Sequence, residues 1–176
     1  MTNIIHGKLE FDIDNEFLEL DYQREDFNNP KDLNEWNDNH YDWVTHFTGF
    51  LCDMRKPQPS WNEKIIEYFE STFGWQDIGT SYYRMDSGVI LPTHQDTYKK
   101  YVDIFKLHGK EDTIYRGIVF LQDWQSGHYA EYDNKILSSW KAGNFVVWNN
   151  DTSHMAANIG VTPRYTLQVT GHVAQS

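Results

Sequence analysis

The sequence predicts a mainly β domain with flanking helices, arranged as a barrel or a sandwich. Two observations support this: strand-like segments that follow one another at short intervals, and turn-forming pairs that separate them. The strand-like segments are residues 79–86, 89–93, 115–122, 128–132, 144–149 and 164–172. Between them lie turn signals such as Ser87-Gly88, Asp133-Asn134, Ala142-Gly143 and Ile159-Gly160. Many short strands with regular turns are typical of barrels and sandwiches.

The first part of the chain carries weaker signals. Residues 8–14 and 16–22 alternate apolar and acidic side chains, which favours exposed or edge strands. Residues 23–39 are polar and rich in Asn and Asp, so we expect a long loop there. Residues 40–51 are dense in aromatic side chains and fit no single pattern.

Two stretches show helical spacing. Ser60 stands at an N-cap position with Glu63 three residues later, which completes a capping box. Apolar positions at helical intervals follow over residues 61–72, and Gly74 is placed to end the helix. We expect this helix to pack against a sheet. A shorter amphipathic stretch, residues 98–105, predicts a second helix.

Length and charge narrow the classes of function. The chain has 176 residues, of which 16% are aromatic, and we expect one domain over residues 1–176 with a substantial core. It carries 26 Asp and Glu against 15 Lys and Arg, a formal net charge of −11. Nucleic-acid affinity comes largely from cationic contacts to phosphate. We therefore expect no nucleic-acid partner.

The cysteine count and the N-terminal sequence indicate the cellular compartment in which the protein is expected. Cys52 is the only cysteine, so an internal disulfide and a cysteine-based metal site are excluded. This fits the reducing cytoplasm, where we expect the protein. Residues 1–10 lack the pattern of a signal peptide, and no run approaches the roughly 18 apolar residues of a membrane span. We therefore expect no membrane association.

A His and an Asp stand two positions apart at His94 and Asp96, after the strand-like segment 89–93. In an extended chain, residues i and i+2 point to the same face, so both side chains can reach one ion. A second histidine, His154, follows the segment 144–149. Two His and one carboxylate on one side of an octahedron form the facial triad of non-haem Fe(II) oxygenases, which leaves positions open for other ligands.

A His-x-Asp pair alone is common and is most often explained by a loop hydrogen bond. Arg164 strengthens the metal hypothesis, because it opens the segment 164–172 ten residues after His154. Alternation in a strand places Thr166 on the same face as Arg164. A guanidinium beside a hydroxyl is a good receptor for a carboxylate, since arginine offers a fixed fork of donors.

Together these motifs resemble the 2-oxoglutarate and Fe(II)-dependent oxygenases, in their prolyl and aspartyl hydroxylase-like branch. The resemblance covers residues 81–172 and rests on four segments in order. They are Gly88 before His94-Gln95-Asp96, then Ala142-Gly143-Asn144-Phe145, then His154 with Asn158 and Gly160, and then Pro163-Arg164-Tyr165-Thr166. It implies a double-stranded β-helix, a cupin-like jelly roll. It also implies His94, Asp96 and His154 as ligands of Fe(II), and Arg164 with Thr166 as the anchor of the distal carboxylate of 2-oxoglutarate.

The activity implied by the resemblance is that of a dioxygenase. Such an enzyme uses Fe(II), 2-oxoglutarate and dioxygen to hydroxylate an amino acid, a peptidyl residue or a related small polar substrate, and releases succinate and CO2. No catalytic side chain is expected beyond the metal ligands. The alternatives are a jelly-roll metal-binding protein and a non-haem iron dioxygenase that does not use 2-oxoglutarate. Arg164 and Thr166 argue against the second, because they have no assigned role without a dicarboxylate, and the presence of all three ligands together with Arg164 argues against the first.

Two further residues are candidates for cosubstrate binding. Arg84 lies ten residues before His94, and Tyr82 shares its face of the strand. The alternative is a surface arginine paired with an acid and a packed aromatic, and a register slip of one residue reverses the assignment. His128 is expected to be a polar residue at a strand end. Asn158 is expected either near the iron or in the turn before Gly160.

Overall fold

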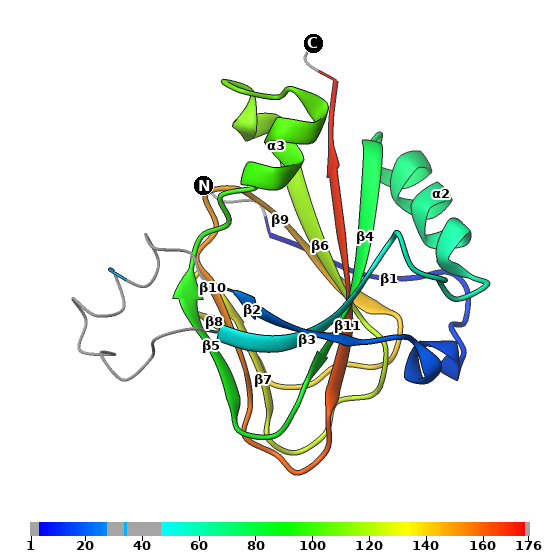
Figure 1. Ribbon diagram of the computed structural model, residues 1–176, viewed down its shortest axis with the longest axis vertical. Helices are drawn as coiled ribbons and strands as arrows, with labels where there is room; N and C mark the ends of the chain where they lie inside the picture. The colour runs from blue at the N-terminus through cyan, green and yellow to red at the C-terminus, as the bar shows by residue number, and fades with distance from the viewer. Residues whose placement is uncertain (1–3, 28–33, 35–46, 175–176) are drawn as a thin grey trace.

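The computed structural model describes residues 4–27, 34 and 47–174. Within this part of the chain the strands form two antiparallel sheets that face each other (Figure 1). The larger sheet contains, in order, β1 (Ile5–Lys8), β9 (Asn144–Asn149), β6 (Ile114–Phe120), β11 (Arg164–His172), β4 (Gln76–Met85), β3 (Phe47–Asp53) and β2 (Gln23–Phe27). The smaller sheet contains, in order, β5 (Val89–His94), β10 (His154–Asn158), β7 (His128–Tyr132) and β8 (Lys135–Leu137).

From β4 onward the chain alternates between the sheets, as β4, β6, β9 and β11 belong to the larger and β5, β7, β8 and β10 to the smaller. This alternation makes the fold a double-stranded β-helix, so the predicted fold class is confirmed. The six predicted strands all form, with ends shifted by at most three residues. Among the strands from β4 onward, β8 and β10 were not predicted, and β10 begins with His154.

Residues 8–22 differ from the prediction of two strands. β1 ends at Lys8, and a short 3-10 helix, η1 (Asn15–Glu19), occupies the second predicted strand. The carboxylate of Asp14 caps η1 by accepting a hydrogen bond from the backbone N–H of Glu16. The acidic residues therefore form a helix cap instead of the outer face of a strand. The predicted loop 23–39 begins with β2, and most of its remainder lies outside the described residues.

Helix α2 (Asn62–Phe73) covers the outer face of the larger sheet (Figure 1). It ends at Gly74 as predicted, with φ of 67°. The predicted capping box is wrong, because Trp61 is the N-cap and makes no side-chain cap hydrogen bond. Ser60 instead donates its backbone N–H to Glu16, at 2.6 Å. The second helix, α3 (Lys99–Phe105), forms as predicted, and a single 3-10 turn, η2 (Glu111–Thr113), precedes β6.

Two hydrophobic layers lie on the two faces of the larger sheet, and a third, smaller cluster lies around α3. The outer layer joins α2 to the larger sheet, and Ile65 and Phe69 of α2 are fully buried in it. The layer between the sheets, called the inter-sheet core below, contains Phe120, Ala130, Tyr132, Trp140, Val146 and Trp148. Gly117 permits the close approach of α2, because an added Cβ there would lie 3.1 Å from the ring of Phe69. Side chains on the inner face of the larger sheet therefore point toward the smaller sheet.

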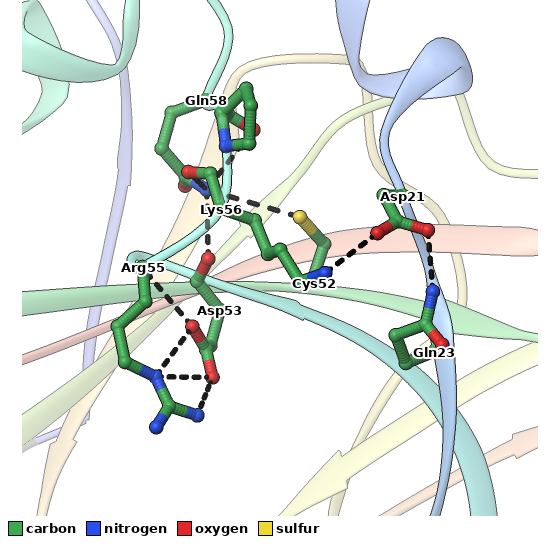
Figure 2. A network of polar contacts seen from close by, with 8 residues as sticks. Asp21, Gln23, Cys52, Asp53, Arg55, Lys56 and Gln58 are labelled. Atoms are coloured by element: carbon green, nitrogen blue, oxygen red, sulfur yellow. Dashed lines mark hydrogen bonds and ion pairs between the residues drawn. The ribbon is translucent and has the colours of Figure 1, made fainter.

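A polar network ties the segment before β2 to the segment after β3 (Figure 2). Lys56 donates to the carboxylate of Asp21 at 2.8 Å, and Gln58 donates to the backbone carbonyl of Asp53 at 2.9 Å. Cys52 lies beside this network as a buried free thiol, and burial raises its pKa. The network is structural, and it lies on β3, at the opposite side of β4 from β11. No helix in the described ranges is long and apolar enough to cross a membrane.

Candidate metal centre

The structure brings His94, Asp96 and His154 together. β5 and β10 are neighbouring antiparallel strands, and His94 stands directly opposite His154 in their register. Asp96 follows two residues beyond the end of β5. One ligand atom of each side chain lies within 4.8 Å of the others, and the two imidazole rings have centroids 4.3 Å apart. The three side chains thus form a group that can hold one metal ion.

A β-bulge produces this alignment. Leu91 pairs with Ala156, but His94, three residues later, pairs with His154, only two residues earlier on β10. β5 therefore holds one extra residue, and without it Thr93 would stand opposite His154. Bulges beside functional sites commonly redirect a side chain in this way. The bulge turns His94 to the same side of the sheet as His154.

Hydrogen bonds at the far side of each ring fix the histidine tautomers. Nδ1 of His94 lies 2.8 Å from the carbonyl of Pro92, and Nδ1 of His154 lies 3.1 Å from the carbonyl of Thr152. A carbonyl oxygen only accepts, so both Nδ1 atoms carry the hydrogen. Each Nε2 therefore presents a lone pair to the site. A backbone carbonyl behind the ring is the usual partner of a metal-binding histidine.

The carboxylate of Asp96 is buried, and its two oxygens differ in their surroundings. Oδ1 accepts a hydrogen bond from the guanidinium of Arg116 in an ion pair. Oδ2 has no hydrogen-bond partner and lies 3.6 Å from Nε2 of His154. Burial acts to raise the pKa of Asp96, but the charges of Arg116, His154 and His94, together with the nearby indole of Trp148, outweigh it and hold the pKa below its usual range.

His154 faces this carboxylate as a neutral base. Burial lowers its pKa to about 4, although the charge of Asp96 acts in the opposite direction. At neutral pH a lone pair on Nε2 therefore faces a lone pair on Oδ2 of Asp96. Two buried acceptors aimed at each other are unfavourable unless a cation lies between them. The donor set of two imidazoles and one carboxylate fits an Fe(II) ion of the facial-triad type.

Arg164 lies at the start of β11 on the inner face of the larger sheet. Its side chain is only 5% exposed, and its guanidinium lies 5.7 Å from the ring centroid of Phe120 and 5.5 Å from that of Trp140. Its Nη1 contacts Sδ of Met85 at 3.8 Å, and its Nε has no hydrogen-bond partner. No carboxylate among the described residues pairs with it. Burial accordingly lowers the pKa of Arg164.

Tyr132 connects the surroundings of Arg164 to those of the triad. It stands opposite His154 on β7, and the two rings stack with centroids 6.2 Å apart. Burial raises the pKa of the Tyr132 hydroxyl to about 12, while the charge of Arg164 lowers it and that of Asp96 raises it. The hydroxyl of Tyr132 therefore interacts electrostatically with both Arg164 and Asp96. Thr166 is also buried, two residues from Arg164 on the same face of β11.

The structure does not bring Arg84 and Tyr82 into this site. In the register of β4 and β11, Tyr82 pairs with Leu167 and Arg84 with Tyr165, on the face opposite to Arg164. Tyr82 is buried under α2 and donates to Oδ1 of Asn62 at 2.7 Å. Their assignment to cosubstrate binding is therefore corrected, because strand alternation turns both away from the inter-sheet core.

Arg84 forms a surface ion pair with Asp86, at 2.9 Å, and its guanidinium lies 4.0 Å from the ring centroid of Phe50. Arg84 is thus a surface arginine paired with an acid, which was the alternative to a role in cosubstrate binding. The residue of β4 that shares the inner face with Thr166 is Tyr83, its partner in the register.

Two other candidates have structural roles. Asn158 donates to the carbonyls of Met85 and Thr162, at 2.9 and 2.8 Å, and accepts from the N–H of Gly160 at 3.0 Å. It therefore takes the turn role. His128 is buried at the start of β7, with Nε2 3.0 Å from the carbonyl of Thr162.

Sequence reasoning missed Arg116, Tyr98 and Tyr132. Arg116 is separated from Asp96 by twenty positions and lies in the other sheet, so no local spacing marks it. Tyr132 carried a usable signal, because period-two spacing in the predicted strand 128–132 places it on the same face as His128 and Ala130, and the structure buries all three.

Comparison with known proteins gives matches among solved structures. No protein-family model matches the sequence, and no curated protein matches it. An oxidoreductase of the 2OG-Fe(II) oxygenase family from Burkholderia pseudomallei aligns over 88% of this chain and 74% of its own, at 10% identity and a TM-score of 0.55. A prolyl-4-hydroxylase from Pseudomonas putida aligns over 87% of this chain and 92% of its own, at 14% identity and a TM-score of 0.51.

The Cnp3 cupin domain from Schizosaccharomyces pombe aligns over 70% of this chain, at 10% identity and a TM-score of 0.42. The alignment spans 64% of that chain, which is less than two thirds of its length. The likeness to the two bacterial proteins supports the double-stranded β-helix, and at 10% and 14% identity it shows the fold alone.

Proposed function

We propose that this protein is an Fe(II)- and 2-oxoglutarate-dependent dioxygenase. The observation that carries the proposal is Arg164, a buried guanidinium to which no carboxylate of the described residues is paired, in the same inter-sheet core as the His94, Asp96 and His154 triad. The triad supplies a metal-binding group, and Arg164 supplies a receptor for an anion. A ligand with a metal-chelating end and a distal carboxylate satisfies both, and 2-oxoglutarate is such a ligand.

The energetics of burial favour an anion at Arg164. Transferring an unpaired charge from water into a protein interior costs several kcal/mol even after relaxation. Contacts with the rings of Phe120 and Trp140 offset only about 1–2 kcal/mol of this cost. A bound carboxylate would form two parallel hydrogen bonds with the guanidinium fork. Thr166, on the same face of β11, would add a hydroxyl donor.

The chain's own groups have separate roles in this scheme. Nε2 of His94, Nε2 of His154 and Oδ2 of Asp96 would hold the metal, and Arg164 with Thr166 would orient the distal carboxylate. Phe120 and Trp140 pack beside Arg164 and Tyr132 packs beside His154, so these apolar rings would limit the access of water. Bound Fe(II) with 2-oxoglutarate and dioxygen would supply the oxidising power for hydroxylation of a C–H bond, with succinate and CO2 as coproducts.

For the primary substrate we propose an amino acid, a peptidyl residue or a related small polar molecule. The formal charge of −11 disfavours a nucleic-acid substrate. The reducing cytoplasm remains the proposed location, since the one cysteine is a buried free thiol.

The test is the release of succinate from 2-oxoglutarate by the purified protein with Fe(II) and dioxygen, first alone and then with amino acids and short peptides. We expect slow uncoupled turnover that rises when the correct substrate is present. Arg164→Ala should abolish the turnover and His94→Ala should do the same, whereas only His94→Ala should lose the metal. Arg84→Ala is the matched control, because that arginine lies on the outer face of the same sheet. A wild-type protein that binds Fe(II) but neither binds nor decarboxylates 2-oxoglutarate would support an iron protein of another kind.

A further inference from the structure

Among the described residues, Arg116 is the one Lys or Arg that forms an ion pair with the triad, and it is largely buried. It lies on β6, opposite Thr170 of β11 and Trp148 of β9. Its side chain is 17% exposed and forms the ion pair with Oδ1 of Asp96. The residue is not one of the proposed metal ligands, and it lies in the other sheet from His94 and His154.

Three groups hold the guanidinium of Arg116 in place. Asp96 accepts from Nη1, and the hydroxyl of Thr170 lies 3.4 Å from Nε. The ring of Tyr98 lies beneath the guanidinium, with 4.7 Å between the carbon Cζ and the ring centroid. An arginine fixed on three sides presents its donors in one orientation.

The backbone at Tyr98 is strained in a way that supports this arrangement. Tyr98 has φ of 49° and ψ of 15°, the left-handed region that a bulky residue rarely adopts. It lies only two residues beyond Asp96, and its ring is buried, with a hydroxyl that has no hydrogen-bond partner. The contact with the guanidinium is the polar interaction that the ring makes. Strain that persists beside a functional group indicates that the surroundings enforce the conformation.

The ion pair makes the two oxygens of Asp96 unequal. Oδ1 accepts from Arg116, whereas Oδ2 accepts no hydrogen bond from the described residues and faces Nε2 of His154. A carboxylate that is free at both oxygens can bind a metal through one oxygen or through both. The ion pair orients Oδ1 toward Arg116 and leaves Oδ2 directed toward His154, which favours coordination through Oδ2 alone. The number of positions left on the metal therefore depends on a residue that does not bind it.

We propose that Arg116 is a positioning residue that restricts Asp96 to coordination through one oxygen, and so keeps three metal positions open. This inference rests on the proposed function, in which 2-oxoglutarate needs two of those positions and dioxygen the third. Arg116 also supplies the counter-charge of the buried carboxylate when no metal is bound. Its role is thus to hold the site ready for the metal and to limit what the metal binds.

The test uses Mn(II) as a substitute ion and counts the water molecules bound to it, by water-proton relaxation and by hyperfine coupling to oxygen-17 water. An octahedral ion with three protein donors keeps three waters, and a carboxylate bound through both oxygens reduces that number to two. We expect three waters in the wild type and two in Arg116→Met. Arg116→Lys should restore three, because its ammonium still reaches Oδ1. Arg84→Met, on the outer face, is the control.

A second measurement links the coordination to the cosubstrate. Binding of 2-oxoglutarate to the Mn(II) protein should weaken by roughly 10–100-fold in Arg116→Met, the usual effect of losing a group behind a metal ligand. If Arg116→Met does not fold, Arg116→Gln replaces it, because the shorter amide does not reach Oδ1 and we again expect two waters. Three waters in a folded Met or Gln variant would overturn the proposal. A wild-type protein that binds no Mn(II) would instead refute the metal centre itself.

Discussion

Replacing Arg164 with methionine separates the stability of the protein from its proposed function. In the ligand-free protein this guanidinium is 5% exposed and has no carboxylate partner among the described residues. Replacing buried charged groups with apolar side chains of similar volume is neutral or stabilises by about 1–4 kcal/mol. The lost contacts with Phe120 and Trp140 subtract about 1 kcal/mol. We therefore expect Arg164→Met to raise the free energy of unfolding by about 1–2 kcal/mol.

For a domain of this size, such a gain raises Tm by roughly 2–8 °C. The assay is thermal and urea unfolding of the metal-loaded, oxygen-free protein with and without 2-oxoglutarate. At roughly 100 times its Kd, the ligand should add about 2.7 kcal/mol to the wild type. It should add nothing to the variant, so the order of stability reverses when the ligand is present.

Arg84→Met is the control for this experiment. Its ion pair with Asp86 is partly exposed, and we expect a change within about 1 kcal/mol and an unchanged response to 2-oxoglutarate. If Arg164→Met destabilised the ligand-free protein by as much as a core truncation, the guanidinium would be satisfied within the fold. If 2-oxoglutarate stabilised the variant as much as the wild type, Arg164 would not be its receptor.

Three further predictions concern neighbouring groups. The pKa of His154 falls from 6.5 to about 4 on folding. The metal-free protein should therefore keep its full free energy of unfolding above pH 6.5 and lose up to about 3 kcal/mol as the pH falls toward 4. Urea unfolding at a series of pH values should show this loss in the wild type and not in His154→Gln. Thr166→Val should weaken 2-oxoglutarate binding roughly 10-fold in calorimetry and leave Fe(II) affinity unchanged; an unaltered Kd would exclude the hydroxyl from the anchor. Tyr82→Phe loses a buried hydrogen bond to Asn62 and should cost about 1–2 kcal/mol in urea unfolding, with unchanged cosubstrate affinity; weakened affinity would mean that the outer face contributes to the site.

Much of the fold was readable in the sequence because period-two alternation and turn residues are local signals. The segments 128–132, 144–149 and 164–172 match β7, β9 and β11 residue for residue. The two strands predicted over residues 8–22 were wrong because acidic residues at alternate positions are compatible with an edge strand and with a helix cap equally well. The capping box predicted at Ser60 was wrong because the hydrogen bonds of Ser60 go to Glu16, forty-four positions away.

The site was predictable only in part. His94 and Asp96 are close in sequence, and Arg164 follows His154 at a readable spacing. The bulge in β5, which brings His94 opposite His154, depends on the pairing of two strands and leaves no local mark. The same holds for Arg116, whose partner lies in the loop after β5. Arg84 and Tyr82 were assigned to the wrong face because their facing depends on the register against β11.

The measurement that tests the central claim most directly is calorimetric titration of 2-oxoglutarate into the oxygen-free protein, with and without Fe(II). We predict one binding site per chain that requires the metal, that is lost in Arg164→Ala and that is retained in Arg84→Ala. Binding of equal strength in Arg164→Ala, or no binding to the Fe(II)-loaded wild type, would contradict the assignment of the buried guanidinium as the receptor for 2-oxoglutarate.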